Sequence, residues 1–128
     1  MPLLFAYGTL RPGAKSSPPD IAAALAKAAH LGRATASGRL HWMGRYPAMV
    51  RAEQDRVIGD VYRIDEAQCA ELWPLLDSYE GDAYVRETIV VTLETGAEMT
   101  APHLEAFVYL ARDPAALGPR IDIGDFLA

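Results

Sequence analysis

The chain has 128 residues and a mass of 13.9 kDa, and its 12 Lys and Arg against 17 Asp and Glu give a formal net charge of −5. With 51% hydrophobic residues, it has the composition and length of one globular domain over residues 1–128, which argues against intrinsic disorder. The acidic balance disfavours a nucleic-acid partner, and no apolar run approaches the roughly 20 residues that span a bilayer, so we predict no membrane partner.

The N-terminal part of the chain predicts a strand, a loop and a helix. The apolar run over 3–7 is typical of a strand buried on both faces. Glycine and proline gather over 8–19, which predicts a long ordered loop. Residues 20–31 are rich in alanine with one apolar stripe, so we predict a helix with Asp20 as its N-cap or first-turn acid.

Three strand-like segments separated by turns follow this helix. They cover residues 38–43, 48–50 and 57–64. The last segment is the richest in strand-forming residues, yet it contains Gly59. A glycine inside such a run indicates a bulge or the close approach of another group.

A second helix is predicted from Asp65 to about Gly81. Asp65 and Gln68 have the spacing of a capping box, and Gly81 is a candidate left-handed cap. The helix presents an inward apolar face of Cys69, Leu72, Trp73 and Leu76. Pro74 predicts a kink or a restart because proline cannot sit comfortably inside a continuous helix.

The C-terminal part alternates as strands over 84–93 and 104–111, with a turn at 94–97. The predicted order is therefore β-α-β-β-β-α-β-β. Two antiparallel hairpin signals favour an α+β fold with a curled or closed mixed sheet over a doubly wound parallel sheet.

Several residues that often carry chemistry have an ordinary structural explanation here. Cys69 lies on the apolar helical stripe, so a small buried hydrophobe is favoured over a catalytic thiol, and one cysteine excludes an intramolecular disulfide. The three histidines show no zinc-ligand spacing, so we predict no metal. The opening 1–6 is too short for a signal peptide, which predicts a cytoplasmic protein.

Two segments indicate a functional site. The strand 3–7 leads into a glycine turn at Gly8, where successive backbone N–H groups can bind a carboxylate and no Cβ blocks a ligand. A simple strand-to-loop turn explains the segment equally well. Glu80 stands at the predicted C-terminus of a helix near several aromatic residues. Both surroundings raise a carboxyl pKa toward that of a useful base, although an exposed glutamate in a last helical turn is the more common case.

Together these segments resemble the gamma-glutamylcyclotransferase-like family over most of the chain. Tyr7–Leu10 is similar to the family's Tyr-Gly-Ser/Thr-Leu substrate loop, and Glu80 falls on its catalytic glutamate within Leu-Asp-x-x-Glu-Gly. Further matching segments are Gly38–Leu40, Tyr46–Val50, Gly59–Tyr62, Tyr84–Arg86 and Val108–Tyr109. Asp60 departs from the pattern, since the family often has Glu there.

The resemblance implies a small mixed, largely antiparallel barrel with two main helices and a cofactor-independent cyclisation. The α-amino group of a γ-glutamyl substrate attacks its own side-chain carbonyl, which releases 5-oxoproline and an amine. Glu80 would be the general acid and base, and the site would need no metal and no covalent enzyme intermediate. Residues implied to bind the substrate are Tyr7, Gly8, Thr9, Leu10, Tyr84 and Tyr109, with Arg11 and Arg86 as weaker candidates.

Several alternatives remain open on the sequence. Tyr84 and Tyr109 fit the core as well as a pocket, Arg86 fits a pairing with a neighbouring acid, and Arg11 fits a solvent-facing position.

A non-catalytic module on the same fold would bind a small carboxylate without forming product. An enzyme that removes a γ-glutamyl protecting group would differ only in its leaving group, which the motifs do not identify. Oligomeric state is equally open, and the loop 11–19 and the tail 113–128 are candidates to border the outer pocket.

Overall fold

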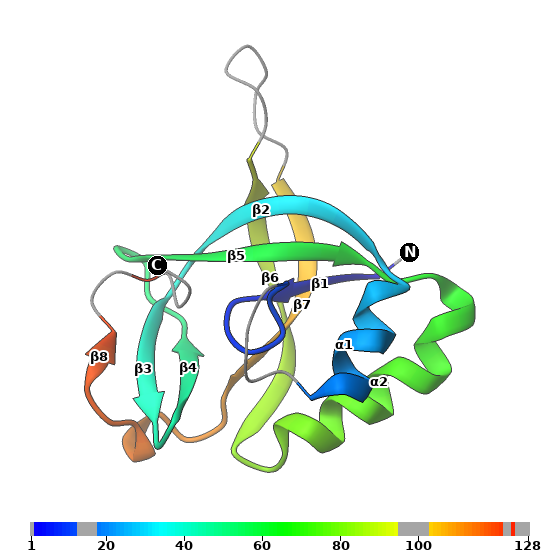
Figure 1. The fold of residues 1–128 in the computed structure, drawn as a ribbon. Coiled ribbons are helices and arrows are strands. Elements are labelled where there is room, and N and C mark those ends of the chain that lie inside the picture. Colours follow the sequence, from blue (N-terminus) through cyan, green and yellow to red (C-terminus); the bar gives the residue numbers. More distant parts are fainter. Residues whose placement is uncertain (1, 13–17, 95–102, 122–123, 125–128) are drawn as a thin grey trace.

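The computed structural model describes residues 2–12, 18–94, 103–121 and 124 (Figure 1). The elements are β1 Leu3–Ala6, α1 Pro19–Ala26, β2 Ala29–Ser37, β3 Arg39–Met43, β4 Tyr46–Val50, β5 Arg56–Arg63, α2 Glu66–Glu80, β6 Tyr84–Leu93, β7 His103–Ala111, the 3-10 helix η1 Pro114–Ala116 and β8 Arg120–Ile121. The predicted α+β class is confirmed.

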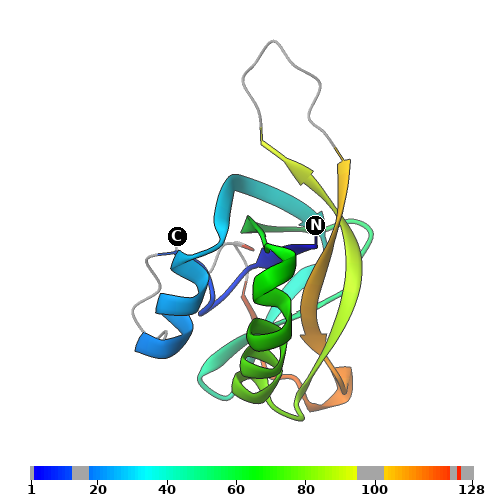
Figure 2. The same cartoon turned by 90° about the vertical axis from the view of Figure 1, so that its right-hand side faces the viewer.

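The strands form one mixed sheet that closes on itself. Its order is β1-β5-β2-β6-β7-β4-β3-β8, and an additional pairing of β1 with β7 closes the first five strands into a barrel. The β1–β7 and β4–β7 pairings are parallel, and the others are antiparallel. Both helices lie on one side of this barrel, and the β6–β7 hairpin extends beyond it (Figures 1 and 2).

Burial on both faces of β1 explains its unbroken apolar sequence. Successive side chains of a strand point to opposite faces. Leu4 therefore joins the core between the barrel and the helices with Ile21 and Leu76, whereas Phe5 joins the barrel interior with Val61. Leu4 is 0% exposed and Phe5 is 1% exposed, which confirms the prediction of a strand buried on both faces.

The first helix is shorter than predicted. It ends at Ala26, not Leu31, and Asp20 lies in its first turn. Residues from Ala29 onward form β2, which the predicted order lacked, and β8 at Arg120–Ile121 was also missed. The other strands begin and end within two residues of their predicted limits.

The second helix runs unbroken through Pro74, so the alternative of a restart there is wrong. Asp65 is its N-cap but makes no side-chain capping hydrogen bond; the Gln68 N–H donates to the Asp65 backbone oxygen at 2.9 Å instead. The predicted capping box is therefore wrong. Gly81 has the expected positive φ of 76°, although its ψ of −168° lies outside the left-handed helical region.

Some predictions concern residues outside the described part of the chain. The turn at 94–97 falls almost wholly there, as do residues 13–17 of the loop and 122–123 and 125–128 of the tail. Within the described ranges, no helix is long and apolar enough to cross a membrane.

Candidate active site

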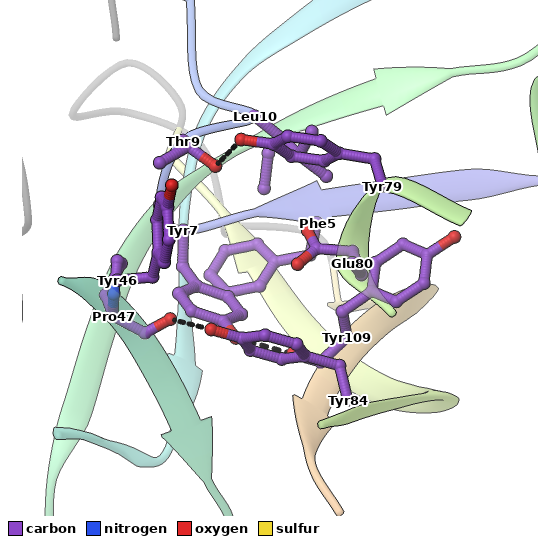
Figure 3. A pocket seen from close by; sticks show the side chains of 12 residues that line it. Phe5, Tyr7, Thr9, Leu10, Tyr46, Pro47, Tyr79, Glu80, Tyr84 and Tyr109 are labelled. Carbon is purple, nitrogen blue, oxygen red and sulfur yellow. Dashed lines mark hydrogen bonds between the residues drawn. The ribbon is translucent and has the colours of Figure 1, made fainter. Parts of the chain in front are cut away.

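A cavity of about 160 Å³ opens where β1 ends, β4 and β6 begin and α2 terminates (Figure 3). It is lined by Phe5, Ala6, Tyr7, Gly8, Thr9, Leu10, Tyr46, Pro47, Tyr79, Glu80, Tyr84 and Tyr109. Sites for drug-sized ligands measure roughly 300–1,000 Å³, so this cavity takes a group about the size of one amino acid.

Among the described residues of this lining, Glu80 is the one Asp, Glu, Lys, Arg or His. It is the last residue of α2, and its carboxyl group points into the cavity (Figure 3). Burial raises the pKa of Glu80 from its usual 4.5 to about 7. The carboxyl can therefore both accept and return a proton near neutral pH.

The Tyr7–Leu10 loop forms the opposite wall of the cavity. It closes as a turn, because the Arg11 backbone N–H donates to the Gly8 oxygen at 3.0 Å. Among the residues that the structure describes, no hydrogen bond takes the backbone N–H of Gly8, Thr9 or Leu10 as its donor. The loop therefore retains donors for an anionic group in the cavity.

Gly8 and Thr9 fix this loop against its neighbours. A Cβ at Gly8 would lie 2.7 Å from Pro47 Cγ, so the loop approaches β4 more closely than a side chain would permit. The Thr9 hydroxyl shares a hydrogen bond of 2.8 Å with the Tyr79 hydroxyl on α2 (Figure 3). The loop and the helix that carries Glu80 are thus tied together across the cavity.

Three tyrosine hydroxyls are occupied by the protein itself. Tyr7 donates to the Tyr109 backbone oxygen at 2.6 Å and accepts from the Met49 N–H at 3.2 Å. Tyr84 donates to the Pro47 oxygen at 2.9 Å. The Tyr109 hydroxyl points away from Glu80 and donates to Asp77 at 2.7 Å (Figure 3).

Burial raises the pKa of each of these three tyrosines well above its usual range. Their hydroxyls therefore stay protonated near neutral pH. Their rings line the cavity.

Seven predicted site residues meet in this cavity: Glu80, Tyr7, Gly8, Thr9, Leu10, Tyr84 and Tyr109. Arg11 and Arg86 lie outside its lining. Arg11 is buried with Asp60, to which its Nε donates at 2.8 Å. Arg86 lies 3.4 Å from Asp77 and stacks over the Trp73 ring at 4.6 Å.

Sequence reasoning did not assign five lining residues, which are Phe5, Ala6, Tyr46, Pro47 and Tyr79. Tyr46 is 51% exposed, so it lies where the cavity opens to solvent. Tyr79 could have been found from the sequence, because it directly precedes Glu80 within the Leu-Asp-x-x-Glu-Gly motif. Pro47 follows Tyr46 in a segment that also matched the family pattern.

Metal binding and thiol chemistry find no support in the described ranges. No group of three or more His, Cys, Asp or Glu side chains there is arranged to hold a metal ion. Cys69 is half-buried, packs against the core beneath α2 and contributes nothing to the cavity lining.

Known proteins resemble this chain over most of its length. A model of the family described as gamma-glutamyl cyclotransferase, AIG2-like, matches residues 4–128. The chain is 33% identical over 120 residues to the gamma-glutamylaminecyclotransferase of Bos taurus, covering 83% of this chain and 63% of the bovine protein. The chain thus spans less than two thirds of that relative's length.

Solved structures share the fold. YkqA from Bacillus subtilis has a TM-score of 0.68 at 26% identity, covering 98% of this chain and 39% of YkqA. An AIG2-like protein from Mus musculus has a TM-score of 0.67 at 22% identity, covering 93% of this chain and 85% of the mouse protein. The mouse protein's similarity concerns the fold alone.

Proposed function

The chain belongs to the gamma-glutamyl cyclotransferase, AIG2-like family, and we propose that it cyclises a γ-glutamyl amine or peptide to 5-oxoproline and a free amine. One observation carries the proposal: across a cavity of amino-acid size, a partly buried carboxyl group with a pKa raised to about 7 lies opposite a loop whose Gly8, Thr9 and Leu10 N–H groups donate no hydrogen bond within the described residues. This arrangement suits a small substrate that has a carboxylate to anchor and a proton to lose.

In the proposed reaction, the substrate's α-amino nitrogen bonds to its γ-carbonyl carbon, and the bond from that carbon to the leaving nitrogen breaks. The α-ammonium loses two protons, and the leaving nitrogen gains two as it departs as an ammonium, so the reaction needs no oxidant and no water. Glu80 accepts a proton from the nucleophile and returns it to the leaving nitrogen. Because both reacting groups share one molecule, the site mainly folds the substrate into its cyclising shape.

The glutamyl end is proposed to lie against the Tyr7–Leu10 loop. The N–H groups of this loop would hold the α-carboxylate. Tyr84 and Tyr109, whose rings line the cavity, would confine the chain between that anchor and Glu80. A cavity of about 160 Å³ leaves the outgoing amine at the rim, beside the exposed Tyr46.

The charge of the lining favours one class of leaving group. In an α-linked dipeptide the leaving amino acid carries a carboxylate one carbon from the scissile nitrogen. That carboxylate would lie near Glu80 in a cavity whose described lining contains no Lys or Arg side chain. We therefore propose a leaving amine without an adjacent carboxylate, which agrees with the name of the bovine relative.

Two isomeric substrates test this proposal, because γ-glutamyl-Nε-lysine and γ-glutamyl-Nα-lysine contain the same atoms and release the same lysine. The Nα isomer places the lysine carboxylate on the carbon that bears the scissile nitrogen, whereas the Nε isomer places it at the far end of the side chain. We expect the protein to form 5-oxoproline from the Nε isomer with a kcat/KM about tenfold or more higher, measured by mass spectrometry. Equal rates would contradict the leaving-group assignment. Binding of 5-oxoproline without turnover of either isomer would indicate a non-catalytic module.

A further inference from the structure

A buried charge network lies directly behind the Tyr7–Leu10 loop and outside the cavity. The Arg11 Nε donates to Asp60 Oδ2 at 2.8 Å, and the two side chains are only 6% and 7% exposed. The other carboxylate oxygen, Asp60 Oδ1, lies 2.9 Å from Nε2 of His30. His30 is itself 45% exposed and packs edge-on against Tyr62 at 5.5 Å between ring centroids.

Asp60 contacts both ends of the loop. Its backbone pairs with Ala6 in the β1–β5 ladder, just before the loop begins. Its side chain binds Arg11, the first residue after the loop, whose N–H closes the turn on Gly8. Tyr62 adds a long contact of 3.5 Å from its hydroxyl to the Leu10 oxygen.

A buried charge network stabilises a fold less than its number of contacts suggests. A buried ion pair loses much of its Coulombic attraction to desolvation, and apolar residues of similar volume often stabilise a fold as well or better. Its directional bonds do what apolar packing cannot, since they fix the orientation of the groups attached to them. Here the attached group is the Tyr7–Leu10 loop, which lines the cavity.

We propose that Asp60 is a positioning residue that acts through Arg11 to hold the Tyr7–Leu10 loop in register for the substrate's α-carboxylate. This assigns Arg11 to support behind the loop instead of substrate contact. The inference rests on the proposed function, because it needs a carboxylate ligand in the cavity.

Two inhibitors that differ only in that carboxylate test the role of Asp60. 5-Oxoproline carries it, and 2-pyrrolidinone is the same ring without it. In Asp60→Asn we expect the inhibition constant of 5-oxoproline to rise about tenfold and that of 2-pyrrolidinone to change by less than about twofold. The KM of the preferred substrate rises in parallel, and kcat falls by less than about threefold.

Asp55→Asn is the matched control, because Asp55 binds Arg120 at 2.7 Å and lies outside the cavity lining. It should leave both inhibition constants unchanged. If Asp60→Asn does not fold, Arg11→Lys keeps the positive charge beside Asp60 but loses the Nε–H donor, and we expect the same selective loss at about threefold or more.

Equal weakening of both inhibitors, or no weakening of either, would overturn the positioning role. Those results require an active wild-type protein. A wild-type protein that neither turns over a γ-glutamyl substrate nor binds 5-oxoproline would instead refute the proposed function, and the positioning role with it.

Discussion

Replacing Glu80 with Gln is expected to lower the turnover of a γ-glutamyl-Nε-lysine substrate by about 10²–10⁴-fold, with little change in KM. Gln keeps the shape and the polar end of the side chain but cannot accept the proton of the α-ammonium. The measurement is the initial rate of 5-oxoproline formation under saturating substrate. Glu71→Gln, an exposed change on the same helix, is the matched control and should retain full activity. Full activity in Glu80→Gln would contradict the assigned base.

The same substitution should stabilise the protein at pH 8. Burial raises the pKa of Glu80 to about 7 from its usual 4.5, so between these pH values the folded chain binds more protons than the unfolded chain. The free energy of unfolding therefore falls as pH rises through this window, by up to ~3 kcal/mol in total. Gln carries no such penalty. Urea denaturation at pH 4.5 and pH 8 should show that the free energy of unfolding falls less with pH in the variant than in the wild type. Equal falls would show that burial does not disfavour the charged form of Glu80.

The pH profile of catalysis should report the same carboxyl group. Its charged form lowers the stability of the fold but is the form that acts as a base. A general base works only when deprotonated, so kcat/KM is expected to rise about tenfold per pH unit below about pH 7 and then level off. The check is a profile of initial rates at subsaturating substrate from pH 4 to pH 8. A midpoint near 4.5 would indicate a solvent-exposed base. A raised pKa thus costs stability at the pH values where the base is active.

The strands that sequence reasoning missed have few local signals. Residues 28 and 29 are alanines that continue the stripe of the first helix, so propensity alone extends it into β2. β2 also lacks a run of branched residues. Its inward positions are Ala34 and Ala36, 0% and 2% exposed, because small side chains fit the interior of a narrow barrel. Only pairing with β5 and β6 makes this segment a strand.

The site was predictable where its residues are contiguous and unpredictable where folding brings them together. Tyr7–Leu10 and Glu80 each lie in a short segment whose chemistry can be read locally. Tyr46 reaches the cavity because β4 pairs with β7, and Asp60 reaches Arg11 because β5 pairs with β1. Those contacts depend on strand order and register, which local patterns do not specify.

Gly59→Ala should be among the most destabilising single substitutions in the barrel, although it adds only one methyl group. The new Cβ would lie 2.5 Å from the Ala6 backbone oxygen and 2.7 and 2.8 Å from two ring carbons of Phe5. The close approach of another group that the sequence indicated at Gly59 is thus β1 itself. The backbone cannot retreat without opening the β1–β5 ladder at Ala6 and Asp60. We expect a loss of ~2–4 kcal/mol in the free energy of unfolding, measured by urea denaturation.

Gly44→Ala separates this clash from the general effect of adding a side chain to a glycine. Gly44 has a φ of +63° and no atom within 4 Å of its ideal Cβ, so its replacement costs only backbone strain of about 1 kcal/mol. Gly59→Ala should exceed that cost clearly. It should also lower activity in the folded protein, because Phe5 and Ala6 line the cavity and lead into the Tyr7–Leu10 loop. A Gly59→Ala protein as stable as the Gly44→Ala protein would show that β1 and β5 tolerate separation at this point, and the loop would then lack the rigid base on which its alignment with Glu80 depends.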